Sequence, residues 1–260
     1  MHRAVVIPHR SRRDLLSVAV ASVTGEVVFV VDDSDAESLD GDSLGSDVRI
    51  VPGGGGMGFA RAVNRGLAAA EASGFTHALI LNDDAAPEPG ALDALCAAWT
   101  SGSGAVGPLL VGPEGIESAG MRLSRWGRLQ NHTDVPPGGR PVDVDAISGA
   151  CMLVRAGTRF DEGYTHGMED VSLCRALRRA GRSVRIVPTV RCRHTGGATV
   201  DRRSSRAQRH AVAGHLRLVG GGVRTPIVLG LAVAQVLREG GPRDRLRAVG
   251  QGWWDWHRAH

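Results

Sequence analysis

The sequence predicts an α/β protein in which a mostly parallel sheet is covered by helices, and two observations predict it. Residues 27–31 (VVFVV) and 78–81 (ALIL) are apolar runs without polar alternation, the pattern of strands buried on both faces. Segments with apolar residues at helical spacing follow such runs, as in successive β-α units. Because parallel strands place their carboxyl ends at one edge of the sheet, we expect ligands to bind there.

The first third of the chain contains two more predicted strands. Residues 4–7 (AVVI) form a strand that Pro8 stops, and Ser11 can cap the helix that follows it. The apolar positions of that helix are Leu15, Leu16 and Val20. Residues 48–51 form the other strand, and a glycine-rich turn leads from it into a helix. The apolar positions of this second helix are Ala60, Val63, Leu67 and Ala70.

The middle of the chain continues the alternation with one long interruption. The expected elements are a helix at 91–98, a strand at 105–111, a half-exposed strand at 142–146 and a buried strand at 150–154. Residues 112–140 are glycine-rich and irregular, and a loop of this length in a compact domain is more often functional than idle. Ser148 and Gly149, between two strands, allow close approach of the backbone to a ligand.

Residues 160–181 (FDEGYTHGMEDVSLCRALRRAG) contain a helix with Glu169 and Asp170 in its first turn and Gly181 as its C-terminal stop. Acids in a first turn complement the helix dipole, and they also suit a general base held at a helix start. A strand at 184–187 follows and ends at Pro188. A loop then begins at His194, which is either structural or a metal ligand.

Residues 201–260 are predicted to be a basic helical extension of a domain that spans residues 1–200. The extension holds eleven arginines against four acidic residues, a net charge of +7, so the first 200 residues carry −3 of the total +4. This asymmetry favours an anionic surface or ligand near the tail. Three tryptophans near its end either pack internally or anchor an interface with a membrane or a partner: Trp253, Trp254 and Trp256.

Composition favours a soluble cytoplasmic protein. The four cysteines (Cys96, Cys151, Cys174 and Cys192) are widely spaced and form no CxxC pair, as expected for reduced core residues. The chain opens without the pattern of a signal peptide, and its longest apolar run, residues 226–237, is too short to span a bilayer. We expect no nucleic-acid partner, and at most contact with the inner face of a membrane.

Two predicted strands end in acidic residues. Asp32 and Asp33 follow the strand at 27–31, and Asn82, Asp83 and Asp84 follow the strand at 78–81. Adjacent carboxylates repel each other, so a cation that bridges a phosphorylated ligand is one reason to keep them together. The other reading is a solvated turn, since Asn and Asp are good turn residues.

A glycine-rich turn offers a competing interpretation. Gly53, Gly55 and Gly58 match the GxGxxG pattern between a strand and a helix, as in an NAD(P)-dependent oxidoreductase, although a run of four glycines meets this pattern almost by accident. That class of enzyme does not account for the acids at 169–170. It also expects the glycine-rich turn to follow the first strand, whereas here two strands come before the strand that leads into the turn.

Eight segments carry a family resemblance in their order along the chain: VVIP, VVDDSD, GMGFARAVNRGL, ALILNDDA, SGACMLVR, FDEGYTHGMEDVSLCRALRRAG, VRIVP and RHTGGAT. Over residues 3–200 this set resembles glycosyltransferase family 2, with the GT-A fold, and in particular its bacterial rhamnosyltransferase-like members. The block from Phe160 to Gly181 is the most specific part. The resemblance implies a Rossmann-like sheet flanked by helices, with the helical extension at the C-terminus.

Carried over position by position, the resemblance implies roles for particular residues. Asp84 is the expected ligand of Mn²⁺ or Mg²⁺, with His194 as a second ligand, and Asp170 is the expected catalytic base, with Glu169 beside it. Asp32 would recognise the base of the nucleotide. The other residues expected at the nucleotide sugar are Pro8, Arg10, Arg61, Asn64, Asn82, Asp83, Ser148 and Gly149.

The implied activity is that of an inverting, hexosyltransferase-type enzyme. It would move a sugar from a UDP- or dTDP-linked donor to a hydroxyl of a glycan, a lipid-linked sugar or a natural-product aglycone. The chain departs from the family pattern at His9, in the run VDDSD and in PGGGGMG, which leaves the nucleotide and the sugar open. A non-catalytic nucleotide-sugar-binding protein is a further alternative to the enzyme, and a homodimer is a further expectation.

Overall fold

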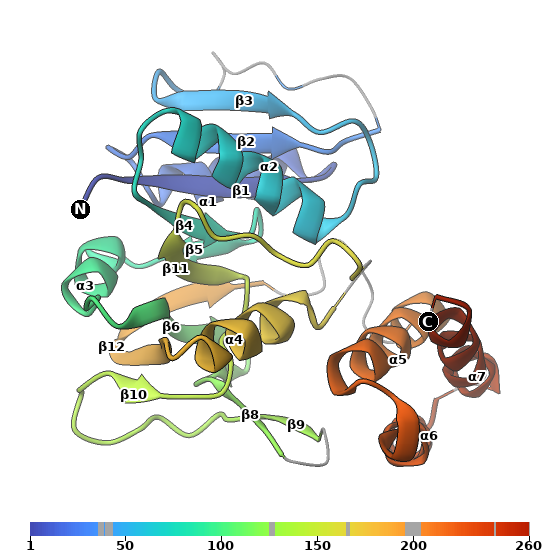
Figure 1. Cartoon of the computed structure of the whole chain (residues 1–260). Helices are drawn as coiled ribbons and strands as arrows, with labels where there is room; N and C mark the ends of the chain where they lie inside the picture. The colour runs from blue at the N-terminus through green and yellow to red at the C-terminus, as the bar shows by residue number, and fades with distance from the viewer. Residues whose placement is uncertain are drawn as a thin grey trace.

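One large mixed sheet with helices on both faces forms the body of the protein, and three helices follow it at the C-terminus (Figure 1). The computed structural model describes residues 1–35, 39, 44–124, 128–164, 167–195, 204–241 and 243–259. The predicted boundary between residues 200 and 201 lies outside the described residues. This architecture confirms the predicted α/β class and the helical C-terminal extension.

The four strands at one side of the sheet run parallel in the order β3-β2-β1-β4, with α1 and α2 among the connections. Their order matches the first half of a nucleotide-binding α/β sheet. The elements are β1 (Arg3–His9), α1 (Arg13–Ala21), β2 (Val28–Asp32), β3 (Val48–Pro52), α2 (Phe59–Ala72) and β4 (His77–Leu81).

The remaining strands make the sheet mixed. β11 lies antiparallel between β4 and β6, β12 runs parallel to β6, and β5 pairs with the far end of β12. The elements are β5 (Ala85–Pro87), α3 (Ala91–Ala97), β6 (Ser103–Gly112), β7 (Gly115–Ser118), β8 (Met121–Leu123), β9 (Leu129–Asn131), β10 (Val142–Asp143), β11 (Cys151–Arg155), α4 (Glu169–Arg179) and β12 (Ser183–His194).

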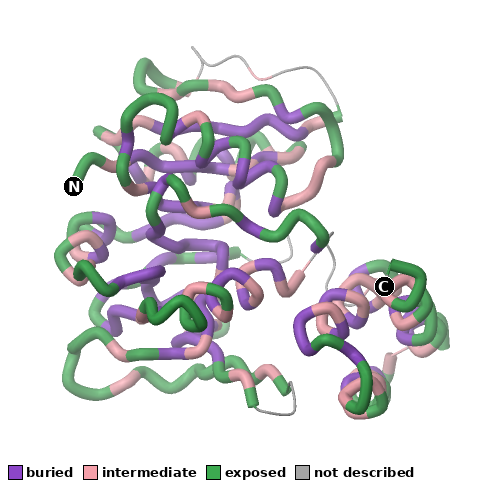
Figure 2. Tube along the Cα trace, viewed as in Figure 1, coloured by how far each residue is buried: buried purple, intermediate pink, exposed green. Residues whose placement is uncertain are grey.

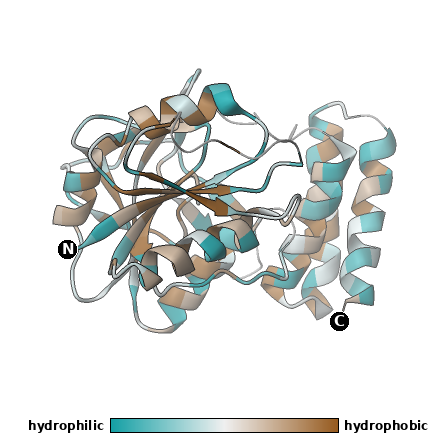
Figure 3. Cartoon of the chain, turned by 90° about the horizontal axis from the view of Figure 1, so that it is seen from above, coloured by the Kyte–Doolittle hydropathy of each residue, from teal (hydrophilic) through white to brown (hydrophobic). Residues whose placement is uncertain are grey.

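Side chains of the central strands alternate between two hydrophobic cores, one on each face of the sheet. Ala4 and Val6 of β1 pack in the core under α2 and α4, whereas Val5 and Ile7 pack in the core under α1 and α3. Both faces of these strands are therefore buried (Figure 2). This explains why the strand sequences are apolar without alternation. The brown, hydrophobic strands in the view from above show the same pattern (Figure 3).

Three local expectations were wrong. Ser11 is not the N-cap of α1: it adopts φ 71°, and Arg12 precedes the helix. β12 does not end at Pro188 but continues to His194, because a register shift between Val187 and Arg191 accommodates the missing N–H of proline. The segment expected to be irregular, residues 112–140, contains β7, β8 and β9.

The predicted half-exposed strand at 142–146 is shorter than expected. Only Val142–Asp143 pairs as β10, with Arg185 and Ile186 near the start of β12. Val144 and Ala146 are buried in the core. The alternation with aspartate therefore predicted the buried apolar side chains of this segment correctly, although most of the segment does not pair in the sheet.

The C-terminal helices are α5 (Ser205–Val219), α6 (Thr225–Arg238) and α7 (Arg243–Arg258), with the short 3₁₀ helix η1 (Gly222–Arg224) before α6. Ser204 caps α5 by accepting a hydrogen bond from the Ala207 N–H. The three helices share a separate small core built around Val212, Leu216 and Val249. Among the described residues, the helices are too short or too polar for any to cross a membrane.

Helix α2 lies directly on the sheet because residue 66 is glycine. A Cβ at Gly66 would fall inside van der Waals distance of Val6 and 2.9 Å from Val31 Cγ2. Gly66→Ala should therefore lower the free energy of unfolding by about 1 to 3 kcal/mol, although alanine favours helix. Gly250→Ala is the matched control, because nothing lies within 4 Å of its added Cβ in α7. It should raise stability by up to about 1 kcal/mol. Urea unfolding of both variants measures the difference, and equal effects would contradict this account of the packing.

Candidate active site

The loops that follow β1, β2, β3 and β4 meet at the carboxyl edge of the parallel half of the sheet. Buried acidic side chains gather there, at the edge where open α/β sheets bind ligands. Each buried carboxylate needs hydrogen-bond donors, because burial otherwise disfavours the charged form. The donors that each one uses define the site.

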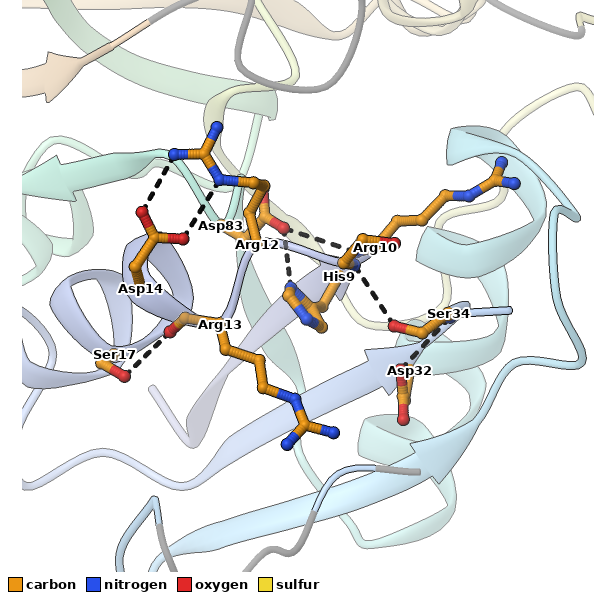
Figure 4. Close-up of polar contacts among 10 residues, drawn as sticks. His9, Arg10, Arg12, Arg13, Asp14, Ser17, Asp32, Ser34 and Asp83 are labelled. Atoms are coloured by element: carbon orange, nitrogen blue, oxygen red, sulfur yellow. Dashed lines mark hydrogen bonds and ion pairs between the residues drawn. The ribbon is translucent and has the colours of Figure 1, made fainter. Parts of the chain in front are cut away.

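Asp83 is bound to the end of β1 (Figure 4). Its Oδ2 accepts a hydrogen bond from His9 Nδ1 at 2.8 Å and a longer one from the Arg10 N–H at 3.4 Å. The His9 side chain is fully buried, and its Nε2 is a buried polar atom without a hydrogen-bond partner among the described residues. This contact accounts for the histidine that departs from the family pattern: Asp83 fixes its ring through Nδ1–H, and in the neutral ring Nε2 is left as an acceptor for a further donor.

Asp32 organises the loop after β2. Its two carboxylate oxygens accept hydrogen bonds from the Ser34 N–H at 3.2 Å and the Leu39 N–H at 2.8 Å. Burial opposes ionisation of Asp32, but hydrogen bonds from Ser34 and Leu39 lower its pKa below the ordinary value. Asp32 is therefore ionised, and it shapes the segment expected to hold a nucleotide base.

The neighbouring Asp33 caps the glycine-rich turn. Its carboxylate accepts hydrogen bonds from the N–H groups of Met57 and Gly58, at 3.0 and 3.3 Å, immediately before α2 begins. These are the N–H groups that a dinucleotide diphosphate would need at a helix N-terminus. A buried carboxylate already uses them, and its charge repels an anion, so this turn does not suit the oxidoreductase alternative.

Gly53 has a separate steric reason to be glycine. A Cβ on it would lie 2.6 Å from the Asp33 Cα, where the loops after β2 and β3 cross. Arg65 of α2 donates hydrogen bonds to the carbonyl oxygens of Pro52 and Gly53. The glycine run thus serves close packing between loops of the protein.

Asp84 and His194 come together at the other side of the edge. His194 Nε2 lies 3.3 Å from Asp84 Oδ1, and its Nδ1 donates a 2.8 Å hydrogen bond to Glu117 Oε2 of β7. The Nε2 contact is at ion-pair distance but too poorly aligned for a hydrogen bond. Asp84 Oδ1 consequently has no hydrogen-bond partner among the described residues, although it is buried.

The electrostatics of this pair are strongly coupled. Burial lowers the pKa of His194, but its contacts with Asp84 and Glu117 outweigh this and raise it to about 9. Burial also opposes ionisation of Asp84, yet the contact with His194 lowers the pKa of Asp84 overall. A cation at this position would replace the proton on Nε2.

The chemistry of these side chains fits a divalent cation. A carboxylate oxygen without a donor and an imidazole nitrogen converge, while Glu117 holds the other ring nitrogen, which is how ligand histidines are usually oriented. In the part of the chain that the structure describes, no group of three His, Cys, Asp or Glu residues surrounds a metal position. Mg²⁺ is commonly bound through one or two protein ligands, with substrate phosphates and water completing its shell.

Glu169 and Asp170 begin α4, as predicted. Asp170 Oδ2 accepts a 3.0 Å hydrogen bond from the Gly149 N–H, and its Oδ1 accepts one from the Val171 N–H. A Cβ at Gly149 would lie 2.9 Å from the Phe59 ring and 3.6 Å from the Asp170 Cβ. Glycine is therefore required where this backbone approaches Asp170.

Glu169 lies in a different environment from Asp170. It is buried, its Oε2 has no hydrogen-bond partner among the described residues, and the preceding Met168 adopts φ 72°. Burial, and then the charge of Asp170, raise the pKa of Glu169 to about 7. Its neighbour Asp170 is only half-buried. The two adjacent acids therefore differ in their exposure and in their hydrogen bonds.

The segment 148–150 joins the two acidic motifs. The Gly149 N–H binds Asp170, and the Ala150 carbonyl accepts a 2.9 Å hydrogen bond from the Asn82 N–H. Ser148 Oγ accepts a hydrogen bond from the Ala150 N–H. Two consecutive residues thus connect the start of the 82–84 motif to Asp170, across the space between β4 and α4.

The other predicted residues fall at the same edge but use their polar groups within the protein. The Asn64 amide binds the Phe160 backbone at 2.7 and 2.9 Å, so it links α2 to the segment that leads to α4. Arg61 lies 3.7 Å from Glu162 and is exposed, and Arg10 pairs with Asp35 at 2.7 Å. Pro8 pairs with Val31 inside the sheet. Asn82 Oδ1 is buried without a hydrogen-bond partner among the described residues.

Sequence reasoning missed Glu117 and the cap made by Asp33. Glu117 lies in the segment expected to be irregular, 77 residues before His194, and only the pairing of β7 with β6 brings it near the end of β12. Asp33 stood beside Asp32 in an acidic run, so nothing in the sequence separated the two. A helix start with free N–H groups 24 residues later was the available signal.

Comparison with known proteins identifies the family of the chain. The family profile "Glycosyltransferase like family 2" matches residues 4–213. Two strains of Mycobacterium tuberculosis have an N-acetylglucosaminyl-diphospho-decaprenol L-rhamnosyltransferase that is 31% identical over 183 residues, covering 57% of this chain. The chain spans 59% of the length of those relatives.

Solved structures share the fold at low sequence identity. GalNAc-T7 with UDP, GalNAc and Mn²⁺ matches 85% of this chain and 48% of its own with a TM-score of 0.62 and 16% identity. Staphylococcus aureus TarS 1–349 matches all of this chain and 92% of its own, at 0.56 and 12%. The mannosyltransferase PcManGT from Pyrobaculum calidifontis, in complex with GDP-Man and Mn²⁺, matches all of this chain and 76% of its own, at 0.55 and 15%.

The buried carboxyl of Glu169 should make stability depend on pH. Its pKa of about 7 in the folded protein, against 4.5 ordinarily, means that the unfolded chain loses this proton first as pH rises. Stability from this group is full below pH 4.5 and is lost as pH rises through 7. The loss is on the order of 3 kcal/mol. Glu169→Gln should remove this dependence on pH. Urea unfolding should therefore show that, between pH 4.5 and 7, the free energy of unfolding of the variant rises relative to that of the parent protein. Parallel pH profiles would refute the assignment.

Proposed function

The chain belongs to glycosyltransferase family 2, and on this premise we propose that it is an inverting glycosyltransferase that uses a nucleotide-diphosphate sugar. The donor is a UDP- or dTDP-linked hexose, and the acceptor supplies a hydroxyl group. The observation that carries the proposal is the bridge through residues 148–150, which joins the 82–84 motif to Asp170. Sugar transfer requires the group that binds the donor diphosphate and the base that deprotonates the acceptor to lie close together.

The nucleotide lies against the loops after β1 and β2 in this proposal. Pro8 and Arg10 border the base, Asp32 accepts its N–H, and Asp83 holds His9 so that the buried Nε2 faces the ligand. Arg61 lies near the diphosphate, while Asn64 acts through its bonds to Phe160. His9, which pairs with Asp32 in the register of β1 and β2, is the residue through which this chain would differ in base preference.

Asp84 and His194 are the proposed ligands of Mn²⁺ or Mg²⁺, with Glu117 holding His194 through Nδ1. When bound, the cation neutralises the diphosphate and stabilises it as a leaving group. Asn82 and Asp83 flank the ligand carboxylate without needing to bind the cation themselves. In particular, Asp83 is already bound to His9 and Arg10.

Asp170 is the proposed general base. It removes the proton from the acceptor hydroxyl as that oxygen bonds to the anomeric carbon, while the bond from that carbon to the diphosphate breaks on the opposite face. The products are an inverted glycoside, a nucleoside diphosphate and a protonated Asp170. The two N–H donors on Asp170 favour its ionised form before the reaction.

Glu169 supports this division of roles. Because burial raises its pKa to about 7, it holds a proton more readily than an ordinary carboxyl group. A neutral Glu169 leaves the negative charge of the pair on Asp170, the half-buried member. Glu169 is thus proposed to keep the negative charge of the pair on Asp170. Ser148 and Gly149 are proposed to hold the backbone near the donor sugar.

The acceptor class follows from the relatives only as a proposal. The mycobacterial relatives are named for an acceptor in which a sugar diphosphate is attached to decaprenol. A lipid-linked sugar at the inner face of a bacterial membrane is consequently the first acceptor to test, ahead of a glycan or a natural-product aglycone. The 1–200 catalytic domain, the 201–260 extension and a homodimer remain predictions of the same proposal.

A non-catalytic nucleotide-sugar-binding protein is the less supported alternative. Binding alone does not require a carboxylate and an imidazole converging without a hydrogen bond, nor a second acid held by backbone N–H groups. The unpartnered Asp84 Oδ1 costs stability where it stands, so its presence beside His194 favours chemistry at the site.

Asp84 should matter more than Asp83 for metal-dependent donor binding. We expect Asp84→Asn to weaken the Mn²⁺-dependent part of UDP binding at least about tenfold, because it removes a ligand charge. Asp83→Asn should have the smaller effect, since Asp83 acts through His9. Titration calorimetry with UDP, with and without Mn²⁺, measures both. The reverse order would contradict the ligand assignment, and thermal stabilisation by NAD alone, independent of Mn²⁺, would contradict the proposed function.

Asp170→Asn tests the base. The variant keeps the hydrogen-bonding shape of the side chain but loses its basicity, so transfer should fall by about 10² to 10⁴ while UDP and Mn²⁺ bind as in the parent protein. Product formation from a panel of nucleotide sugars, measured at equal donor saturation, gives the rate. Full turnover by Asp170→Asn would show that another group accepts the proton.

A further inference from the structure

Exposed apolar side chains are concentrated on the C-terminal helices. Within the described ranges, the large hydrophobic side chains that are exposed are Met1, Val18, Val135, Val223, Leu231, Val233, Leu237 and Trp254. Five of these eight lie between residues 223 and 254, although that stretch is a small part of the chain. The body of the protein buries its apolar residues, so the C-terminal concentration needs its own explanation.

Helix α6 is the centre of this surface. Its sequence, TPIVLGLAVAQVLR, is mostly apolar, yet only Val228 and Val236 are buried. These two face the small core shared with α5 and α7. On the other side, Gly230, Val233 and Leu237 recur at helical spacing and are exposed, and Leu231 is exposed on an adjoining side of the helix. Leu237 is 62% exposed. The helix therefore presents an apolar face to its surroundings as well as to its core.

The position of α6 leaves that face uncovered. Its main contacts are with α5, α7 and η1, and the sheet lies on the other side of α5 (Figure 1). The exposed stretches of the C-terminal helices are visible in Figure 2. A surface helix that is apolar on the side facing its core and also on the side facing solvent is the arrangement of an element that meets an apolar phase or a partner.

Basic side chains stand at both ends of α6. Arg224 precedes its first residue, Arg238 is its last residue, and Arg243 begins α7. Across the described residues, these three arginines form no ion pair with an acidic side chain, whereas Arg209, Arg217 and Arg245 do. The net charge of +7 on residues 201–260 is thus partly unneutralised around the apolar face. An apolar strip with cationic ends is complementary to an anionic lipid surface.

We propose that the exposed face of α6, with Arg224, Arg238 and Arg243 at its ends, docks on the surface of an anionic lipid bilayer. Its 14 residues span roughly 21 Å at 1.5 Å per residue, which is shorter than the hydrocarbon core of a bilayer. The helix therefore lies in the plane of the interface, with its apolar side chains among the acyl chains and its arginines among the headgroups.

A second copy of this chain fits the same surface poorly. A two-fold interface would place α6 against α6 and bring Arg224, Arg238 and Arg243 of one copy near those of the other. Like charges at the rim of an apolar contact oppose that association. Anionic headgroups, by contrast, neutralise these arginines. The docking surface goes beyond the proposed function, and it would bring a glycosyltransferase to acceptors anchored in lipid.

Vesicle co-sedimentation of the full chain tests the docking surface without any transfer reaction. The protein should bind vesicles made of equal parts phosphatidylglycerol and phosphatidylcholine, and bind phosphatidylcholine alone much more weakly. The double variant Leu231→Glu, Leu237→Glu should bind the mixed vesicles at least about tenfold more weakly. Val18→Glu is the matched control, because Val18 is 54% exposed on α1, and it should bind as the parent protein does.

The arginines give a second, independent measurement. Arg238→Gln with Arg243→Gln should weaken binding to the mixed vesicles several-fold and flatten its dependence on salt. Circular dichroism and UDP-dependent thermal stabilisation establish that the variants remain folded.

The proposal is overturned if the folded parent protein does not bind anionic vesicles, or if the double leucine variant binds them as well as the parent protein does. It is also overturned if sedimentation velocity shows a dimer that this variant dissociates while vesicles bind neither form. Vesicle binding by a protein that proves inactive in sugar transfer would leave the docking surface standing and refute the proposed function alone.

Discussion

The burial of four aspartates at one edge of the sheet is the constraint on which the rest of this site depends. Asp32, Asp33, Asp83 and Asp84 all lie at the ends of β2 and β4 and are largely shielded from water. Three of them are satisfied by donors of the protein: loop N–H groups, the start of α2 and His9. Asp84 is the exception, because its Oδ1 faces His194 without a hydrogen bond. Three carboxylates thus shape this edge, and the fourth keeps an unpartnered oxygen that the proposed cation would use.

The C-terminal helices take part in positioning the second half of the site. Gly214 of α5 packs on the turn before α4, where an added Cβ would lie 2.9 Å from the Gly167 carbonyl oxygen. Arg217 of the same helix binds Asp161 through two nitrogens and covers the Tyr164 ring. The residues that lead into Glu169 are therefore held between α2, through Asn64, and α5. The helical extension is a structural partner of the candidate base as well as the carrier of the apolar face of α6.

Much of this fold could be predicted because buried parallel strands and amphipathic helices leave strong local patterns. The strand at 77–81, the apolar face of α2 and the start of α4 follow directly from such patterns. The errors arose where tertiary contacts override local rules. Pro188 does not end β12, because it lies in an irregular part of that strand. Ser11 does not cap α1, because it adopts a left-handed conformation. Glu117 could not be found because its partner lies 77 residues away and meets it only across three strands. Local sequence carries no record of that pairing.

The same distinction decides between the two readings of the glycine-rich turn. Sequence alone compares patterns, and PGGGGMG satisfies a phosphate-binding pattern as well as a packing one. The structure compares hydrogen bonds, and the N–H groups at the start of α2 are already bound to Asp33. An anion there would have to displace a buried carboxylate and overcome its charge, a cost with no compensating donor. The diphosphate of a nucleotide sugar is better accommodated beside Asp84 and His194, where the positive charge would come from a cation. Glycines at 53–58 then serve to bring two loops together, and in the proposed function the nucleotide lies against Asp32 beside them.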